Sequence, residues 1–205
     1  MEEHQRARVL DAAITIFAEQ GYPATTVDDL VAAAKIGVGS FYGFFSGKEQ
    51  CLLAACERII DEARSVVVAA ASEGTSWPDQ VCLGLGRLLN WIGAEPLAAR
   101  VALVEIQTGG AEAIARYEET LTTAARALER GRESLPRDRR LPDSLEETTV
   151  NGIAWLLHRR LTMGESESIP QLFGELGEMI LEPYLGEARA TKAIARHAPI
   201  EHRGS

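Results

Sequence analysis

The 205-residue sequence has no excess of basic side chains and no long apolar run. Lysine and arginine number 21 against 30 aspartates and glutamates, a formal net charge of −9. A basic excess is the usual mark of a nucleic-acid-binding chain, so bulk charge argues against that class. No uninterrupted apolar run reaches the roughly 18 residues of a membrane span, and the polar start does not resemble a signal peptide. We therefore expect a cytoplasmic protein without a membrane partner.

Cysteine and histidine are scarce as well. The three cysteines, Cys51, Cys56 and Cys82, are odd in number and lack metal-ligand spacing. We interpret them as small buried side chains in a reducing compartment, with a redox switch as the alternative. The four histidines are scattered, and the chain has neither a glycine-rich phosphate loop nor a Gly-x-Ser-x-Gly elbow. These absences predict no metal site, no cofactor and no enzymatic activity.

Two short helices joined by a tight turn are predicted between residues 26 and 44. Thr26, followed three residues later by Asp29, is a box-like N-cap. The next apolar side chains recur at helical spacing, namely Val27, Leu30, Val31 and Ala34. Residues 35–37 break this pattern, with Ile36 expected to be buried and Gly37 expected to be the N-cap of the second helix.

The second helix, at about residues 38–44, has two distinct faces. Phe41 and Phe45 stand at i and i+4 as its core side. Four side chains are left for its outer side, namely Val38, Ser40, Tyr42 and Phe44. Ser46 and Glu49 then form a predicted capping box for a third helix, where Lys48 and the helix N-terminus together favour a phosphate. A turn between two such helices suits the DNA major groove.

A larger set of residues between positions 8 and 53, including several of those above, forms a recognisable pattern by its combined spacing. They are Ala12, Ala13, Phe17, Gly21, Tyr22, Thr25, Thr26, Val27, Ala33, Ala34, Gly39, Ser40, Phe41, Tyr42, Phe45, Lys48, Glu49 and Leu52. Together they resemble the N-terminal DNA-binding domain of the TetR family of one-component repressors. The resemblance covers roughly a quarter of the chain. It implies an all-α fold, with a three-helix helix-turn-helix domain at 1–48 and a helical ligand-binding and dimerisation domain at 49–205.

The resemblance also implies a regulator that binds double-stranded operator DNA as a homodimer and is released by a small-molecule effector. The expected DNA-binding residues are Thr26, Lys35, Val38, Gly39, Ser40, Tyr42, Phe44 and Lys48. No arginine is available for guanine, so base reading is expected through hydroxyls and apolar contacts, with few phosphate contacts and a modest salt dependence.

Three residues depart from the family pattern. Gly37 stands where a serine or threonine cap is usual, and Phe44 stands where tyrosine or histidine is common. Gly43 weakens the second helix, because an interior glycine costs about 1 kcal/mol relative to alanine. The domain at 1–48, called the head below, is acidic, and its second helix is weak. These two features keep open an alternative function: a helical adaptor or sensor that retains the head but does not read DNA.

Beyond residue 46 the pattern predicts helices at about 47–72, 77–92, 97–107, 111–132, 143–163, 169–185 and 188–197. In TetR-like proteins the last two strong helices pair with a symmetry mate. This resemblance places the dimer interface at Ile153, Leu157, Leu161, Leu172, Phe173, Leu176, Met179 and Ile180. Use of these side chains in the chain's own core is the alternative.

The effector is expected to be hydrophobic or aromatic, because small-molecule sites are mostly apolar with a few polar groups. The candidate ligand-binding residues lie in the central helices: Leu85, Leu89, Trp91, Leu103, Ile106, Gln107, Tyr117, Asn151 and Trp155. Each of them, taken alone, is better explained as ordinary core than as a ligand contact.

Overall fold

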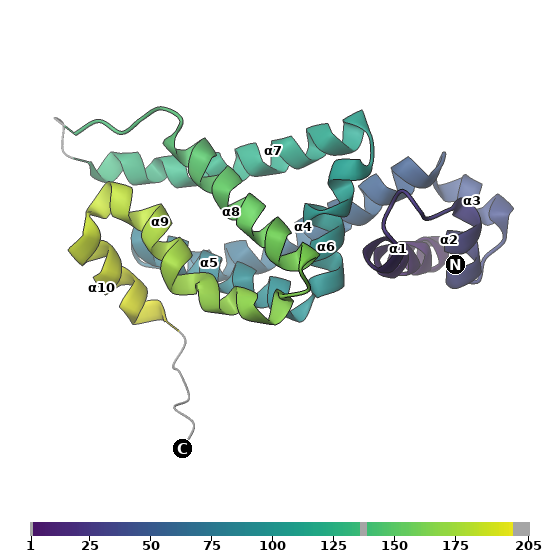
Figure 1. The fold of residues 1–205 in the computed structure, drawn as a ribbon, viewed down its shortest axis with the longest axis horizontal. Helices are drawn as coiled ribbons and strands as arrows, with labels where there is room; N and C mark the ends of the chain where they lie inside the picture. Colours follow the sequence, from purple (N-terminus) through teal and green to yellow (C-terminus); the bar gives the residue numbers. More distant parts are fainter. Residues whose placement is uncertain (1, 136–138, 199–205) are drawn as a thin grey trace, which may run out of the picture. The chain divides into compact units, whose positions relative to one another are not determined.

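The computed structural model describes residues 2–135 and 139–198, which contain helices and no strand (Figure 1). The predicted all-α fold is confirmed. The helices are α1 (Glu2–Gln20), α2 (Val27–Ala34), α3 (Val38–Phe44), α4 (Lys48–Ser72), α5 (Trp77–Ala94), α6 (Pro96–Leu103), α7 (Ala111–Leu128), α8 (Leu145–Thr162), α9 (Phe173–Leu185) and α10 (Glu187–His197). Three 3₁₀ segments join them, η1 (Glu105–Thr108), η2 (Glu129–Ser134) and η3 (Ser166–Leu172).

Three of the predicted helices are wrong as single α-helices. The segment 111–132 ends its α-helical part at Leu128 and continues as the tighter η2. The segment 97–107 ends its α-helical part at Leu103, and after Val104 it continues as the tighter η1. The segment 169–185 begins as η3, which contains Pro170. The α-helix α9 starts only at Phe173.

The chain forms two compact units. Unit 1 takes in the described residues up to Glu62, with Glu95–Thr120 and Leu157–Gly164. Unit 2 takes in Ala63–Ala94, the described part of Leu121–Leu156, and the described residues from Glu165 on. Helices α4, α7 and α8 contribute residues to both. These two units are defined by packing. The boundary predicted at residue 48 separates a DNA-binding domain from a ligand-binding domain, and it stays a prediction.

The core of unit 1 is built on the apolar faces that the spacing predicted. Helix α1 packs against α2 and α6, and α2 contacts α3. Its buried side chains include Val9, Leu10, Ala13, Phe17, Leu30, Val31, Ala34, Phe41, Phe45, Leu52 and Ala55. Burial of each large side chain contributes roughly 1.5–3 kcal/mol, so these contacts set how α3 is oriented on α1 and α2.

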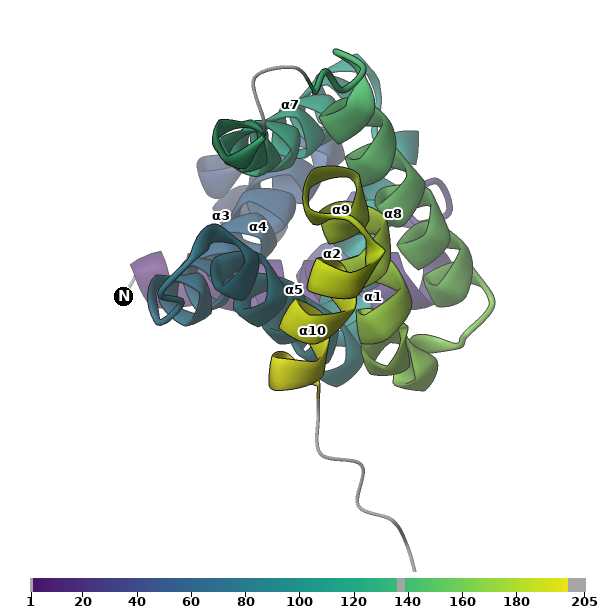
Figure 2. The ribbon, with the colours of Figure 1, turned by 90° about the vertical axis from the view of Figure 1, so that its left-hand side faces the viewer.

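Unit 2 packs α5 against η3, α9 and α10, and α10 lies along α9 (Figure 2). Two glycines permit close approach. A Cβ on Gly93 would lie 3.0 Å from the Pro170 side chain, and one on Gly177 would lie 3.1 Å from that of Ile194. Gly177 therefore allows α9 and α10 to approach closely, whereas a Cβ on Gly174 would meet nothing within 4 Å.

A buried carboxylate, that of Asp79, connects the end of α10 to the start of α5. Asp79 is 6% exposed. It accepts hydrogen bonds from the Ser76 hydroxyl at 2.5 Å and the Thr75 hydroxyl at 3.2 Å. The His197 ring lies 2.9 Å from it and the Arg196 guanidinium 3.2 Å. The bonds from Ser76 and His197, in that order, lower the pKa of Asp79 to about 2.

We expect Asp79→Asn to lower the free energy of unfolding at pH 7 by about 2 kcal/mol, since one pKa unit corresponds to about 1.4 kcal/mol. The folded-state pKa lies below the ordinary 3.8. The carboxylate therefore stabilises the fold above about pH 4, and this contribution is lost as the pH falls towards about 2. Urea unfolding at pH 7 and at low pH measures both effects, with Glu118→Gln as an exposed control. Equal stability of wild type and variant at pH 7 would contradict the assignment.

Candidate nucleic-acid interface

The first helix of the turn, α2, begins with the predicted cap. Thr26 is the N-cap, and its hydroxyl accepts the Asp29 N–H at 3.2 Å. The Asp29 carboxylate in return accepts the Thr26 N–H at 2.8 Å and hydroxyl at 2.6 Å. These bonds lower the pKa of Asp29. The capping box is confirmed, and it holds the exposed Thr26 at the start of α2.

The turn between α2 and α3 is closed by backbone geometry and by an arginine from α1. Lys35 adopts the left-handed conformation with φ 53°, and its N–H bonds the Ala32 carbonyl at 3.2 Å. The Arg8 guanidinium donates to the carbonyls of Ala34 and Lys35, which satisfies the exposed C-terminal end of α2. Ile36, which was expected to be buried, is half-buried. The Lys35 side chain itself is exposed.

Helix α3 presents the two faces that its sequence predicted. Phe41 and Phe45 are buried, with ring centroids 5.5 Å apart. On the other side Val38 is 46% exposed and Tyr42 is 55% exposed. Gly39 and Ser40 are exposed as well, and Phe44 is half-buried. Gly37 is the N-cap without a side-chain hydrogen bond, as predicted. The outward face is therefore available to a partner.

The start of α4 differs from the prediction. The helix begins at Lys48, and the Ser46 N–H donates to the Gln50 side chain instead of a Ser46–Glu49 box. The Lys48 ammonium donates to the Tyr22 carbonyl at 2.8 Å and the Thr25 carbonyl at 2.7 Å, and it lies 4.3 Å from the Tyr22 ring centroid. Lys48 thus holds the α1–α2 loop. Its predicted phosphate contact stays a prediction, with two of its three N–H donors already bonded.

Lys48→Met should lower the free energy of unfolding by about 2 kcal/mol, because hydrogen bonds to charged groups contribute about 1.5–3 kcal/mol. Methionine keeps most of the apolar stem and removes the charge. Denaturant unfolding measures the change. Lys35→Met is the matched control, since the Lys35 side chain is exposed. Equal effects of the two substitutions would show that the carbonyl contacts of Lys48 add nothing.

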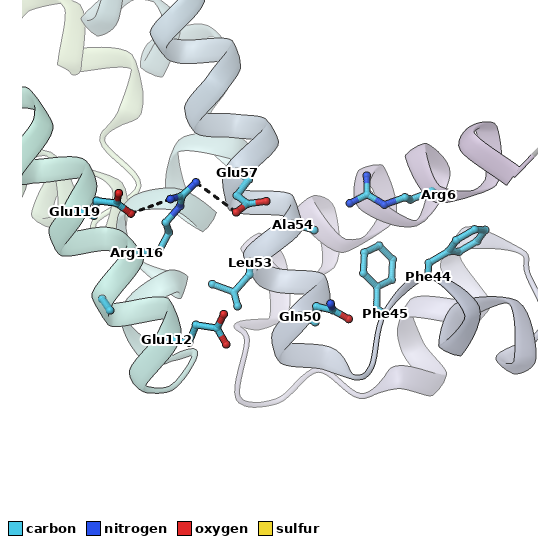
Figure 3. Close-up of a pocket in the computed structure, with 11 residues that line it drawn as sticks. Arg6, Phe44, Phe45, Gln50, Leu53, Ala54, Glu57, Glu112, Arg116 and Glu119 are labelled. Atoms are coloured by element: carbon cyan, nitrogen blue, oxygen red, sulfur yellow. Dashed lines mark hydrogen bonds and ion pairs between the residues drawn. The ribbon is translucent and has the colours of Figure 1, made fainter.

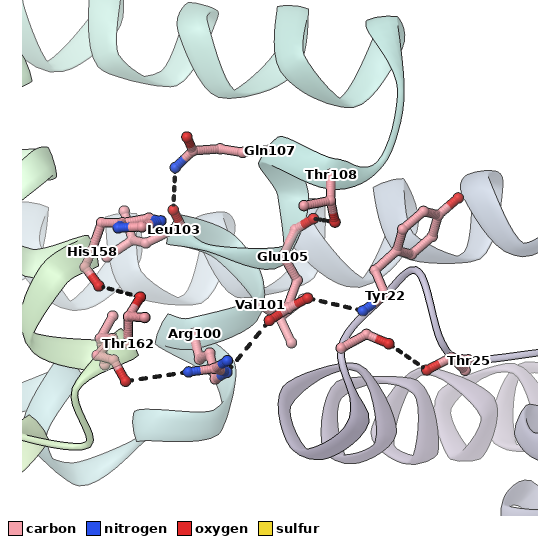
Figure 4. A network of polar contacts seen from close by, with 12 residues as sticks. Tyr22, Thr25, Arg100, Val101, Leu103, Glu105, Gln107, Thr108, His158 and Thr162 are labelled. Atoms are coloured by element: carbon pink, nitrogen blue, oxygen red, sulfur yellow. Dashed lines mark hydrogen bonds and ion pairs between the residues drawn. The ribbon is translucent and has the colours of Figure 1, made fainter.

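A second contact to the same loop comes from Glu105 in η1, a residue that the sequence did not single out for this role (Figure 4). Glu105 is 4% exposed, and its carboxylate accepts the Tyr22 N–H at 2.8 Å. The Arg100 Nε lies 3.4 Å from the other carboxylate oxygen, and Arg100 also donates to the Leu161 carbonyl at 3.3 Å. The only sequence signal was a lone acid in an apolar segment.

The predicted ligand-binding residues fall into both units. Within unit 1, Ile106 is buried, Leu103 and Tyr117 are half-buried and Gln107 is exposed. The remaining five belong to unit 2, where Leu85 and Leu89 are buried, Trp91 is half-buried, and Asn151 and Trp155 are exposed. Their binding of an effector stays a prediction.

Most of the predicted dimer residues are buried within the single chain. Six have little exposed surface, namely Leu157, Leu161, Leu172, Phe173, Leu176 and Ile180. Ile153 is half-buried and Met179 is 40% exposed. Met179 lies close to α8, because its Cε is 3.2 Å from where a Cβ on Gly152 would be. Trp155 follows three residues after Gly152 and is 62% exposed.

The three cysteines are buried, as predicted. Burial raises the pKa of Cys51 and Cys56 to about 12 and that of Cys82 to about 11, so their thiols are unreactive. Across residues 2–135 and 139–198, no three histidine, cysteine or acidic side chains are grouped to hold a metal ion. Over the same residues, no helix is both long and apolar enough to cross a bilayer.

Comparisons with known proteins match the head in sequence and most of the chain in fold. The family profile of bacterial regulatory proteins, tetR family, matches residues 9–55. The HTH-type transcriptional regulator YerO of Bacillus subtilis (strain 168) is 38% identical over 56 residues, 27% of this chain and 19% of YerO. The HTH-type transcriptional repressor KstR2 of Rhodococcus jostii (strain RHA1) is 51% identical over 45 residues, 22% of each chain. The chain thus aligns with about a fifth of these relatives' length.

A solved structure extends the likeness in fold to most of the chain. The transcriptional regulator FadR from Bacillus subtilis, solved in complex with stearoyl-CoA, has a TM-score of 0.74 at 17% identity. The match covers 88% of this chain and 98% of FadR. At this identity the likeness shows a shared fold alone.

Proposed function

This chain belongs to the TetR family of bacterial transcriptional regulators, and from that premise we propose that it is a repressor. It binds double-stranded operator DNA as a homodimer in the cytoplasm and releases the DNA when a small hydrophobic or aromatic effector binds. The observation that carries the proposal is the outward face of α3, which is exposed while Phe41 and Phe45 anchor the helix from behind.

Base reading would use the exposed side chains of α3. The hydroxyls of Ser40 and Tyr42 hydrogen-bond base edges, and Val38 contacts thymine methyls in the major groove. Gly39 carries no side chain, so the backbone can approach the DNA there. A dimer would present two such helices about 34–36 Å apart, which matches successive major grooves of an operator with dyad symmetry.

Few cations of the head are free for phosphates. Arg8 bonds the end of α2, Arg6 lies over the Phe45 ring at 5.5 Å, and Lys48 bonds the α1–α2 loop. Lys35 is the exposed lysine beside α3. Because the salt dependence of DNA binding follows the number of phosphates neutralised, this head should show a small salt slope. Hydrogen bonds from the start of α2, beside Thr26, add phosphate contacts without net charge.

Release by an effector would act through the contacts of the α1–α2 loop. Glu105 bonds the Tyr22 N–H from η1, and Lys48 bonds the Tyr22 carbonyl from α4. A ligand that displaces η1 withdraws Glu105 and lets this loop, and α2 after it, change position. To switch nearly completely, the effector must bind the DNA-incompetent state about 10⁴-fold more tightly.

Dimerisation would bury the exposed part of α8 and α9. Six of the eight side chains first predicted for this interface serve the chain's own core. The proposed contacts are therefore the exposed Trp155 and Met179, which contact their counterparts across a two-fold axis.

Trp155→Glu is expected to raise the dimer dissociation constant at least about tenfold, since burying an unpaired carboxylate at an interface is unfavourable. Analytical ultracentrifugation of the full chain over a dilution series measures it. Val68→Glu is the control, because Val68 is an apolar residue of α4 that is 60% exposed. If Trp155→Glu, like the control Val68→Glu, had the dimer dissociation constant of wild type, the dimer interface would lie elsewhere.

The proposal is tested by titrating purified, ligand-free protein against its own upstream intergenic DNA at low and moderate salt. Sequence-selective, salt-sensitive binding by a dimer is the expected result. A folded dimer that binds no DNA would instead favour the second function, an adaptor or sensor that keeps the head but acts through protein contacts. The acidic composition, with 30 acids against 21 bases, is the observation that favours this alternative.

A further inference from the structure

A pocket of about 470 Å³ opens in unit 1 beside the C-terminal end of α3 (Figure 3). Its apolar wall is formed by Leu53 and Ala54 of α4, Ala115 of α7 and the Phe45 ring. Phe44, the last residue of α3, also lines it. None of the nine side chains predicted to bind an effector takes part.

Some of the charged side chains around this pocket have ion-pair partners and others do not. Arg116 bonds Glu119 at 2.8 Å and Glu57 at 3.3 Å. Arg6 lies over the Phe45 ring. Glu112, in the first turn of α7, lines the pocket and has no hydrogen bond or ion pair among the described residues. The lining therefore holds three carboxylates against two guanidinium groups, a net charge of −1.

We propose that this pocket binds a small organic cation with an apolar body, such as an arylalkyl ammonium ion. The cationic group pairs with the Glu112 carboxylate, and the apolar body lies on Leu53 and Ala115. An anion is disfavoured because the lining carries a net charge of −1 and the Arg116 guanidinium already has two carboxylate partners. Such a site combines an apolar wall with one polar anchor, the usual composition of small-molecule pockets.

Occupancy of this pocket would act directly on α3. Phe44 lines the pocket and belongs to the helix that is proposed to read DNA, so a ligand there changes the packing at the end of that helix. This regulatory consequence rests on the proposed function, whereas the binding itself does not.

Isothermal titration calorimetry of the full chain with benzyltrimethylammonium tests the site without DNA. We expect saturable binding, with 3-phenylpropionate, an anion with a similar aryl body, binding more weakly. Glu112→Gln should weaken binding of the cation about fivefold, the upper range for a partly exposed ion pair. Ala115→Trp should abolish it by filling the pocket, and the exposed Glu118→Gln on the same helix should leave it unchanged.

No binding of the cation, equal binding of the anion, or an unchanged affinity in Glu112→Gln would each overturn the proposal. Circular dichroism of Ala115→Trp checks that its loss of binding is not a loss of fold, and the conservative Glu112→Gln gives an independent result. A protein that binds the cation in this way but binds no operator DNA would overturn the proposed function and support the site. The two failures are therefore distinguishable.

Discussion

Phe41→Ala is expected to lower the free energy of unfolding by about 3–5 kcal/mol, the usual loss for removing a fully buried phenylalanine. Phe41 has no exposed surface. Its ring contacts those of Phe45 and Tyr42, with both pairs of centroids 5.5 Å apart. It is therefore the main anchor of the short helix α3, whose glycines give it little stability of its own. Urea unfolding followed by circular dichroism measures the loss.

Phe41→Leu serves as the control, because it keeps an apolar side chain and should cost less than alanine. The alanine variant should also fail to bind operator DNA, since α3 loses its support. A Phe41→Ala protein with wild-type stability would show that α3 is not held by this side chain.

Tyr42→Ala, one residue further on, is expected to leave stability nearly unchanged and to weaken operator binding about 100-fold. Tyr42 is 55% exposed, so little core packing is lost. A lost contact of about 1.4 kcal/mol in each head is doubled in a dimer, and each 1.4 kcal/mol is a factor of ten in affinity. A gel-shift titration of dimeric variant and wild type on the same operator fragment measures the ratio.

Tyr42→Phe separates the two contributions of this side chain. If the hydroxyl bonds a base or phosphate, the phenylalanine variant should lose part of the affinity that alanine loses. If the ring makes only apolar contact, phenylalanine should bind as wild type does. Unchanged affinity in Tyr42→Ala would remove the outward face of α3 from the DNA interface.

The neighbouring Phe41 and Tyr42 show how much of the head could be predicted. Helical spacing assigns the two residues to opposite faces, and the structure places one inside and one outside. The cap at Thr26 was equally predictable, because its partner Asp29 lies three residues away in the chain. Local features of this kind depend on short-range geometry that every helix shares.

The contacts of Lys48 and Glu105 could not be predicted from the sequence. The position of Lys48 at a helix start predicts a phosphate contact, but its ammonium bonds carbonyls 23 and 26 residues earlier in the chain. Glu105 bonds a backbone N–H that lies 83 residues away. Such pairs form because tertiary packing brings distant segments together, and no periodicity in the sequence marks them.

The apolar faces of α8 and α9 show the same limit for the predicted dimer interface. Helical spacing predicts that Leu157, Leu161 and Leu176 lie on apolar helix faces. It does not predict which segment covers those faces. Packing within the chain buries all three and leaves Trp155 and Met179 exposed. The pocket beside Phe44 likewise depends on where α4 and α7 stand within unit 1, so its residues share no sequence motif.

The sequence by itself determined the all-α class, the order and approximate bounds of the helices, the two faces of α3 and the family to which the head belongs. These properties follow from local caps, turns and apolar periods. Only the tertiary structure decided which apolar residues are core, which charges are already paired and where a cavity is left. Burial and charge pairing are properties of segments that meet in space, and the chain order of residues does not contain that information.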